Sequence, residues 1–91
     1  MSSGTVYLIT CVRCGDEYVG ESARALSIRI KEHLIGKEKS RSCTPLGAHR
    51  VENHAGADFE VTVKILAYET RTPARKTLEA FWIRARNPKM N

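Results

Sequence analysis

Tyr7 and Tyr18 are the first residues of the chain whose type and spacing suggest shared chemistry. Each lies in a short segment rich in β-branched and aromatic residues, TVYLIT and EYVG, and a turn-prone stretch joins the two. This pattern is typical of a β-hairpin, in which side chains on one face lie within contact distance across the strands. The hairpin predicts that the two phenols can meet, although in isolation both are more simply explained as core or sheet-surface aromatics.

Arg29 and His33 are four residues apart in a segment with helical periodicity, so they share one face of the predicted helix. The planar guanidinium group of arginine matches the geometry of a phosphate, and an imidazole can take or give a proton near neutral pH. Together they can address one anionic ligand. The alternative is a solvated basic helix face, which is the usual role of such a pair.

Glu79 is a lone carboxylate inside the apolar stretch LEAFWI of the last predicted helix. A carboxylate beside a buried face must find a cation or reach water. Mg²⁺ is bound in proteins by one or two carboxylates together with substrate phosphate oxygens, so a single glutamate can suffice. Alternatively, Glu79 forms an ion pair along the helix with Arg75 or Arg86.

Cys11 and Cys14, in the segment CVRCG, have the spacing of a zinc knuckle, with two thiolates on a tight turn and a glycine where the backbone must bend. A tetrahedral site needs two further ligands, for which His49 and His54 are the best candidates. Their five-residue separation spreads them around a regular helix, so His54 must lie at or beyond the helix end. Cys43 is an alternative to one histidine, and His33 is a rival ligand that we assign to the phosphate-binding pair instead. The remaining alternative is that the thiols are reduced and the histidines unrelated.

The first helix that must position these residues is predicted from residue 23 onward. Ser22 can cap its free N–H groups, and Leu26, Ile30 and Leu34 form one apolar stripe. Gly36 is expected to end this helix.

Two further helices and a strand follow along the chain. Thr44 and Pro45 predict the start of a short helix that ends near residue 56. Residues 59–68 alternate between apolar and polar side chains, which predicts a half-buried strand. Thr72 and Pro73 repeat the capping device for a last helix over 74–86, which residues 87 and 88 end. The side chains that this helix is expected to bury are Leu78, Phe81, Trp82 and Ala85.

The resulting order, β-β-α-α-β-α, predicts an α/β (α+β) domain with a small, three-stranded, mainly antiparallel sheet flanked by helices. A chain of 91 residues with 42% hydrophobic residues can build one core but not two. We therefore expect one domain over residues 5–91, and residues 1–4 to be a disordered or vector-derived leader.

Composition indicates an intracellular protein with an anionic partner. Three cysteines and no apolar run long enough to span a bilayer favour a reducing compartment and no membrane. Fifteen Lys and Arg against ten Asp and Glu give a net charge of +5, which suits nucleic acid. The basic residues are spread over several elements, as expected for phosphate tracking rather than base reading: Arg24, Lys31, Arg41, Arg50, Arg71, Arg75 and Lys76.

In this order and spacing, the motifs resemble those of the GIY-YIG nucleases. The matching segments are Val6-Tyr7, then Tyr18-Val19-Gly20 after ten residues, Leu26-x-x-Arg29-x-x-x-His33, Leu78-Glu79-x-x-Trp82-Ile83 and the final Asn91. Each motif is short, but five in the family's order over nearly the whole chain are specific together. The cysteine pair and the downstream histidines are similar to those of the endonuclease domain of Penelope-like retroelements.

This resemblance implies a metal-dependent DNA endonuclease that hydrolyses phosphodiester bonds, nicking one strand at a time. Glu79 would hold one Mg²⁺ or Mn²⁺, Arg29 would steady the charge on phosphorus, and Tyr7 would be the base or orient it, while Tyr18 and His33 place water and phosphate. The expected DNA contacts are Arg24, Lys31, Arg75, Lys76 and Asn91. Zn²⁺ would be structural, other domains of a larger parent protein would supply targeting, and the location would be nuclear or otherwise intracellular.

The chain departs from the family's pattern at several points, of which the replacement of two isoleucines by Val6 and Val19 preserves strand character. Thr5 stands in place of the first glycine, and Asp16 and Glu17 precede Tyr18 where many members carry a lysine. The missing lysine leaves phosphate binding to other cations, such as Lys31 or Arg24. The alternative function is therefore a catalytically inactive, zinc-stapled, nucleic-acid-binding module of the same fold.

Overall fold

The computed structural model describes residues 4–91, which form a three-stranded sheet and three helices in the predicted order. The strands pair only antiparallel, in the order β2-β1-β3, so the first strand is central. The fold prediction is confirmed. The elements are β1 (Thr5–Cys11), β2 (Glu17–Ser22), α1 (Leu26–Glu38), α2 (Pro45–His54), β3 (Val61–Tyr68) and α3 (Thr72–Arg86).

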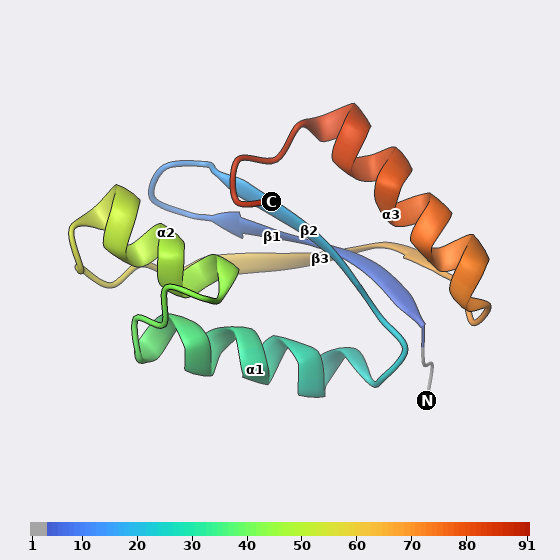
Figure 1. The fold of residues 1–91 in the computed structure, drawn as a ribbon, viewed down its shortest axis with the longest axis horizontal. Coiled ribbons are helices and arrows are strands. Elements are labelled where there is room, and N and C mark those ends of the chain that lie inside the picture. The colour runs from blue at the N-terminus through green and yellow to red at the C-terminus, as the bar shows by residue number, and fades with distance from the viewer. Residues whose placement is uncertain (1–3) are drawn as a thin grey trace.

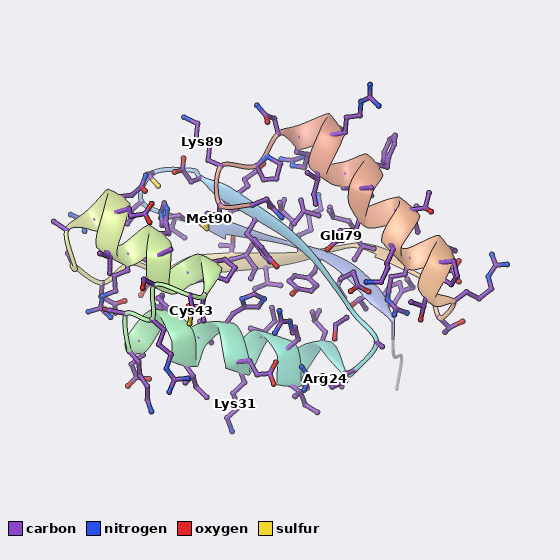
Figure 2. All side chains as sticks on the ribbon, viewed as in Figure 1. Arg24, Lys31, Cys43, Glu79, Lys89 and Met90 are labelled. Atoms are coloured by element: carbon purple, nitrogen blue, oxygen red, sulfur yellow. The ribbon has the colours of Figure 1, made fainter. Side chains whose placement is uncertain are left out.

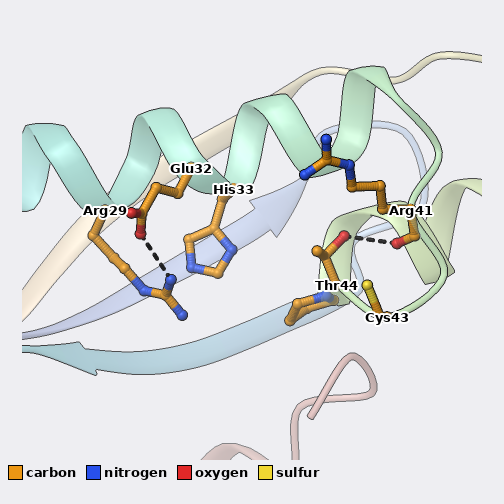
Figure 3. A pocket seen from close by; sticks show the side chains of 7 residues that line it. Arg29, Glu32, His33, Arg41, Cys43 and Thr44 are labelled. Carbon is orange, nitrogen blue, oxygen red and sulfur yellow. Dashed lines mark hydrogen bonds and ion pairs between the residues drawn. The ribbon is translucent and has the colours of Figure 1, made fainter.

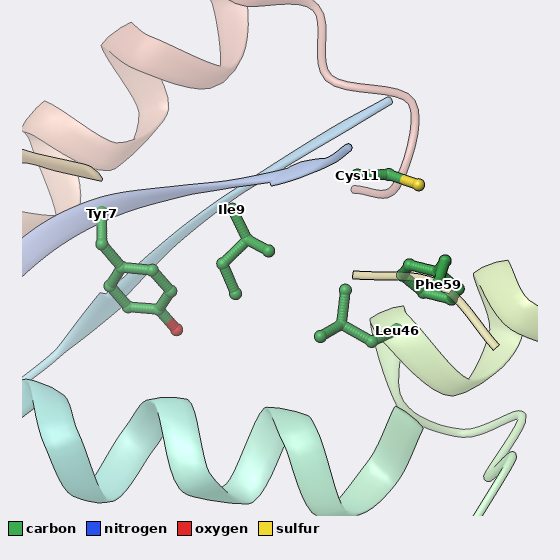
Figure 4. Packing of buried hydrophobic residues seen from close by; sticks show 5 residues of the cluster. All are labelled: Tyr7, Ile9, Cys11, Leu46 and Phe59. Atoms are coloured by element: carbon green, nitrogen blue, oxygen red, sulfur yellow. The ribbon is translucent and has the colours of Figure 1, made fainter. Parts of the chain in front are cut away.

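Helices cover both faces of the sheet, with α1 and α2 on one side and α3 on the other (Figure 1). Successive residues of a strand face opposite sides, so β1 contributes to two separate cores. The core under α1 and α2 contains Tyr7, Ile9, Cys11, Leu46 and Phe59, drawn in Figure 4. The core under α3 contains Val6, Leu8 and Val19, packed against Leu78, Trp82 and Ile83.

The ends of the helices agree only in part with their predicted caps. The Thr44 hydroxyl accepts a hydrogen bond from the Gly47 N–H at 3.2 Å, and α2 begins at the following proline as predicted. Ser22, in contrast, is the last residue of β2, and its hydroxyl accepts from the Arg24 N–H in a turn before α1. Thr72 likewise lies inside α3 and makes no capping bond, and α1 continues past Gly36 to Glu38.

Several apolar side chains that were predicted to be buried are exposed. Phe81 is 60% exposed and Leu34 39%, and Ala85 is also exposed. Each helix touches the sheet along a narrower face than its apolar stripe, so the outermost residues of the stripe reach solvent. In β3, the register shifts beside Val6 and Tyr7, so the later residues of this strand pack toward α3 while Val63 remains 40% exposed.

Gly4 belongs to the fold, contrary to the prediction that excluded it. The residue is buried, its φ is +91°, and its carbonyl oxygen accepts a hydrogen bond from the Glu69 N–H at 3.0 Å. A side chain at this position would collide with the Glu69 carbonyl. The rest of the predicted leader, residues 1–3, lies outside the described residues. None of the helices within residues 4–91 has the length and apolar character needed to cross a membrane.

Candidate functional site

Three aromatic rings from three different elements meet on the sheet face under α1. The ring centroids of Tyr7 and Tyr18 are 6.4 Å apart, and those of His33 lie 5.8 Å from Tyr7 and 5.2 Å from Tyr18. Gly20 lies opposite Tyr7 in the hairpin, and a Cβ atom there would come within 2.6 Å of Tyr7 Cζ and 2.8 Å of Tyr18 Cε2. A glycine at this position therefore makes room for the paired phenols.

The Tyr7 hydroxyl and His33 Nε2 form a buried hydrogen bond of 2.8 Å. Burial and then the nearby Arg29 charge lower the pKa of His33 to about 4, so the imidazole is neutral at pH 7. Burial and then the Tyr18 charge raise the pKa of Tyr7 to about 12, so its phenol is protonated. The phenol therefore donates to Nε2, which leaves the imidazole proton on Nδ1.

Arg29 lies beside both phenols and is held by an acidic residue that sequence analysis missed. Burial raises the pKa of Tyr18, and the Arg29 charge opposes this rise, as it does for Tyr7. The Arg29 guanidinium donates to Glu32 at 3.0 Å, and the same carboxylate accepts two hydrogen bonds from Arg24. The i, i+3 spacing of Arg29 and Glu32 was the available signal. This contact fixes the guanidinium and leaves one-third of its side chain exposed.

Glu79 points from α3 toward the sheet, as Figure 2 shows. Burial, and next the charge of Glu21, raise the pKa of Glu79 above its usual range. Its own charge contributes to the raised pKa values of Tyr7 and Tyr18, which places it within electrostatic range of both phenols. We call these five residues, Tyr7, Tyr18, Arg29, His33 and Glu79, the tyrosine cluster.

The alternative ion pairs considered for Glu79 are formed elsewhere. Arg75 donates to Glu21 at 2.7 Å, and Arg86 donates to Glu17 at 2.6 Å. Within residues 4–91, the Glu79 carboxylate has neither a hydrogen-bond donor nor an ion-pair partner. It is a half-buried acid without a cation of its own.

Two of the predicted DNA contacts are used inside the protein. The Arg75 side chain is buried, and besides Glu21 it donates to the carbonyl oxygens of Glu69 and Thr70. It joins α3 to β2, and burial removes it from the surface that a phosphate could reach. The Asn91 amide accepts from the Val19 N–H and donates to the Val19 carbonyl, both at 2.8 Å, which ties the C-terminal residues to the outer edge of β2.

The other three predicted DNA contacts are exposed, but they do not converge. Arg24 is engaged with Glu32, as described above. Lys31 points away from the sheet on the outer side of α1 (Figure 2). Lys76 lies on α3 with its Nζ 3.6 Å from the Glu21 carboxylate. Arg24 and Lys31 lie beside α1, whereas Lys76 lies on α3 on the other side of the sheet, so a single phosphate cannot be bound by all three.

Four sulfur and nitrogen atoms gather at the tip of the β1–β2 hairpin. The ligand atoms of Cys11, Cys14, His49 and His54 all lie within 4.8 Å of one another. Sγ of Cys14 is 3.3 Å from His49 Nε2, Sγ of Cys11 is 3.5 Å from His54 Nε2, and the two Nε2 atoms are 3.0 Å apart. With the usual zinc bond lengths, a tetrahedral ion separates such atoms by about 3.3–3.8 Å. We call this group the Cys/His cluster.

The backbone and the neighbouring side chains hold the Cys/His cluster in place. Gly15 has a φ of +79° and its N–H donates to the Cys11 carbonyl, which closes the turn between the two cysteines. His54 is the last residue of α2, as its spacing from His49 required. Asp16 lies 3.8 Å from His49 Nδ1, a position from which a carboxylate orients a metal-bound imidazole. Cys43 lies outside the cluster.

A model of the GIY-YIG catalytic domain family matches residues 3–91 of the chain. The match includes all residues of the tyrosine cluster and of the Cys/His cluster. No curated protein matches the chain, and no solved structure matches it either.

Proposed function

Because the chain belongs to the GIY-YIG catalytic domain family, a family of nucleases, we propose that it is a divalent-metal-dependent DNA endonuclease that hydrolyses phosphodiester bonds. The observation that carries this proposal is the tyrosine cluster. Residues from β1, β2, α1 and α3 contribute a guanidinium, a neutral imidazole, two phenols and an unpaired carboxylate to one region of the fold. The guanidinium and a carboxylate that can hold a divalent ion meet the main needs of phosphodiester hydrolysis, which are positive charge at the phosphate and an activated water.

In phosphoryl transfer, negative charge spreads over the equatorial oxygens of phosphorus, so fixed cations do most of the catalytic work. Arg29 is the cation best placed for this role. Its contact with Glu32 holds the guanidinium in position, while its remaining N–H groups can donate to a phosphate in the forked geometry of arginine. Glu32 cancels the charge of Arg29 only in part, because this carboxylate is shared with Arg24.

Tyr7 acts through His33. The phenol has no exposed surface and a pKa of about 12, so it neither touches the substrate nor loses its proton easily. Its hydroxyl instead fixes the tautomer and the orientation of the neutral imidazole. Tyr18 is only half-buried and is therefore the phenol that can place the attacking water.

Glu79 fits the requirement of a hard divalent cation such as Mg²⁺ or Mn²⁺. A half-buried carboxylate without a partner is costly unless a cation joins it, and such ions take one or two carboxylates together with phosphate oxygens. When bound, the ion supplies charge neutralisation at the phosphate and promotes deprotonation of water. Glu79 would hold the ion from α3, while Arg29 would bind the phosphate from α1.

We further propose that the Cys/His cluster binds one structural Zn²⁺. The distances among its four ligand atoms suit a tetrahedral ion, and four protein ligands leave no open position for catalysis. The ion would join the hairpin tip to α2. In a small domain, such a link supplies stability that the core alone provides only in part.

Three finer features of the proposal rest on the resemblance alone. We propose an origin in a Penelope-like retroelement, cleavage of one strand at a time by the single site, and action in the nucleus or another reducing intracellular compartment. Targeting would come from other domains of a longer parent protein. The exposed cations of this domain are spread over several elements, which supports a weak preference for DNA sequence.

The test is nicking of supercoiled plasmid DNA with Mg²⁺ or Mn²⁺, with and without a chelator. The protein should convert supercoiled plasmid to the open-circular form, and both Glu79→Gln and Arg29→Ala should abolish this conversion while the proteins stay folded. Arg84→Ala, on the last turn of α3, is the matched control for loss of a surface charge. DNA binding without any metal-dependent cleavage would instead establish the inactive binding module.

A further inference from the structure

A pocket of about 370 Å³ opens beside His33, between α1 and the start of α2. Arg29, Glu32 and His33 line it from α1, and Arg41 and Thr44 line it from the following loop and the α2 cap (Figure 3). Its volume is in the range of ligand-binding pockets, about 300–1,000 Å³. The pocket shares Arg29 and His33 with the tyrosine cluster, but neither Glu79 nor Tyr18 lines it, so it adjoins the place proposed for the reacting phosphate.

The pocket presents donors without partners. His33 is 3% exposed, and Nδ1, which carries the imidazole proton, has no partner within residues 4–91 but is not sealed from solvent. In Figure 3 the ring turns one nitrogen toward the side of the pocket formed by Arg41 and Thr44. The Arg41 guanidinium also lacks an ion pair or hydrogen bond in the described part of the chain. A buried N–H and a free guanidinium that line one pocket are suited to an anion.

Positive charge prevails in the pocket although Glu32 contributes to its lining. Among the lining residues, Arg29 and Arg41 oppose Glu32, a net charge of +1, and this carboxylate is bonded to Arg24 outside the lining as well as to Arg29. His33 adds no charge at neutral pH because its pKa is about 4. An incoming anion therefore meets a net attraction.

The loop that carries Arg41 is fixed before any ligand binds. The Arg41 N–H donates to the Gly36 carbonyl, and the Arg41 carbonyl accepts from both the N–H and the hydroxyl of Thr44, the latter at 2.7 Å. Gly47 approaches this loop so closely that a Cβ atom there would collide with the Arg41 carbonyl. A fixed loop loses little conformational entropy when its side chain binds a ligand.

We propose that this pocket, lined by Arg29, His33, Arg41 and Thr44, binds a phosphate of the cleaved strand that flanks the scissile phosphate. The inference rests on the proposed nuclease function and adds Arg41 and His33 Nδ1 as the groups that set the position of the strand. Phosphates of one strand follow each other at about 3.4 Å along the helix axis, so a second fixed phosphate defines the register of the strand in the site. A contact to a phosphate carries no sequence information, which agrees with the weak sequence preference proposed above.

A phosphate scan tests this directly. In a short duplex with a known cleavage position, each phosphate in turn is replaced by an uncharged methylphosphonate, and kcat/KM is measured for the unmodified protein, Arg41→Ala and Arg84→Ala. We expect one flanking position at which the unmodified protein loses about tenfold, the size expected for a lost hydrogen bond between charged groups. Arg41→Ala should be slower by a similar factor on normal DNA and insensitive at that position alone. If kcat/KM depended on the position of the methylphosphonate in the same way for Arg41→Ala and Arg84→Ala, the proposal would be overturned.

Binding measurements keep the two proposals separable. Affinity for the uncleaved duplex is measured without divalent metal at several salt concentrations. For Arg41→Ala, the slope of log affinity against log salt concentration should be shallower by about 0.9, the value of one phosphate contact, whereas for Arg84→Ala the slope should be unchanged. A protein that cuts DNA but shows no such difference retains the nuclease function and loses the pocket assignment. A protein that shows the difference but never cuts retains the pocket and loses the nuclease function.

Cys43 offers a second readout in the unmodified protein, because its exposed thiol lines the same pocket. Bound duplex should slow alkylation of Cys43, whereas the duplex with a methylphosphonate at the sensitive position should not. Protection by millimolar inorganic phosphate that equals protection by DNA would show a free-anion pocket and contradict the flanking-phosphate assignment. Cys43→Ser identifies the thiol that is labelled.

Discussion

The ligand atoms of the Cys/His cluster all lie within 4.8 Å of one another at the hairpin tip, whereas the tyrosine cluster leaves Glu79 unpaired and opens into a pocket beside His33. The first arrangement is complete once one metal ion is bound. The second leaves the Glu79 carboxylate available for a metal ion and the His33 Nδ1 available for a phosphate. This contrast is the one expected between a structural metal site, in which protein groups fill every position, and a catalytic site, which keeps positions open for substrate. We therefore expect changes in the two clusters to affect different properties.

The largest effect should come from Cys14→Ser. The Cys14 side chain is exposed, so this change removes a ligand without opening a cavity in the core. Structural zinc contributes apparent free energies of about 10–16 kcal/mol in small zinc domains, comparable with the whole stability of a domain. We expect the free energy of unfolding to fall by more than about 3 kcal/mol, with loss of stoichiometric zinc, as measured by urea denaturation and metal analysis.

Cys43→Ser is the matched control for that change. Its thiol is exposed and lies outside the cluster, so stability should change by less than about 0.5 kcal/mol. If Cys43→Ser lost the zinc and Cys14→Ser kept it, the ligand set proposed here would be wrong. Folded protein of natural sequence that contains no zinc after purification would remove the structural-metal proposal altogether.

Glu79→Gln should show the opposite behaviour, with a loss of cleavage and no loss of stability. A metal ligand in phosphoryl transfer is worth several kcal/mol, so nicking should fall by about 10³-fold. The carboxylate is half-buried and unpaired, and its pKa is raised, so its neutral isostere should be at least as stable at pH 7. Thermal unfolding and plasmid nicking, measured on the same sample, check both halves. A large drop in melting temperature would indicate that Glu79 is structural.

His33 should affect both stability and cleavage, because it is a buried group and also part of the tyrosine cluster. Its pKa falls from about 6.5 in the unfolded chain to about 4 in the folded protein. As pH falls below 6.5, the unfolded state takes up a proton that the folded state does not bind, so stability falls until pH 4. Between pH 7 and pH 5, this linkage amounts to about 2 kcal/mol.

The control for this prediction is His33→Gln, which retains an acceptor for the Tyr7 hydroxyl but does not titrate. Acid also protonates the ligands of the Cys/His cluster, but it does so in both proteins, so the difference between their unfolding free energies isolates His33. We expect the unmodified protein to lose more stability on acidification. Parallel curves for the two proteins would show that His33 is not buried in its neutral form.

The fold was predictable because it depends on local patterns. The β-branched and aromatic residues of β1, the apolar spacing of α1 and the Thr44-Pro45 cap each specify one element, and the order of elements leaves few topologies. The Cys/His cluster was predictable for a similar reason, since pairs of ligands close in the sequence require only one tertiary contact. The exposure of single side chains was harder to predict. Phe81 was assigned to the core because periodicity gives the direction of a helix face but not its width.

Long-range charge pairing could not be read from the sequence. Arg75 and Glu21 are separated by 54 positions, and only the fold brings them together in a buried pair. The same applies to the sharing of Glu32 between two arginines and to the position of Arg41 opposite His33. Each cation has many possible partners in the sequence, whereas packing selects one.

Asn91→Ala should have the smallest effect, and it asks whether the C-terminal residue supports the tyrosine cluster through β2. The two Asn91 hydrogen bonds to Val19 hold the outer edge of the strand one residue after Tyr18. Both groups of Val19 would face water after the substitution, so the cost should be about 1 kcal/mol. Lys89→Ala, whose side chain points away from the protein, is the control (Figure 2). Because the amide is occupied by β2, DNA affinity at a temperature where both variants are folded should be the same. A selective loss of affinity in Asn91→Ala would show that the amide leaves the strand to bind phosphate, and would move the edge of β2 into the nucleic-acid surface.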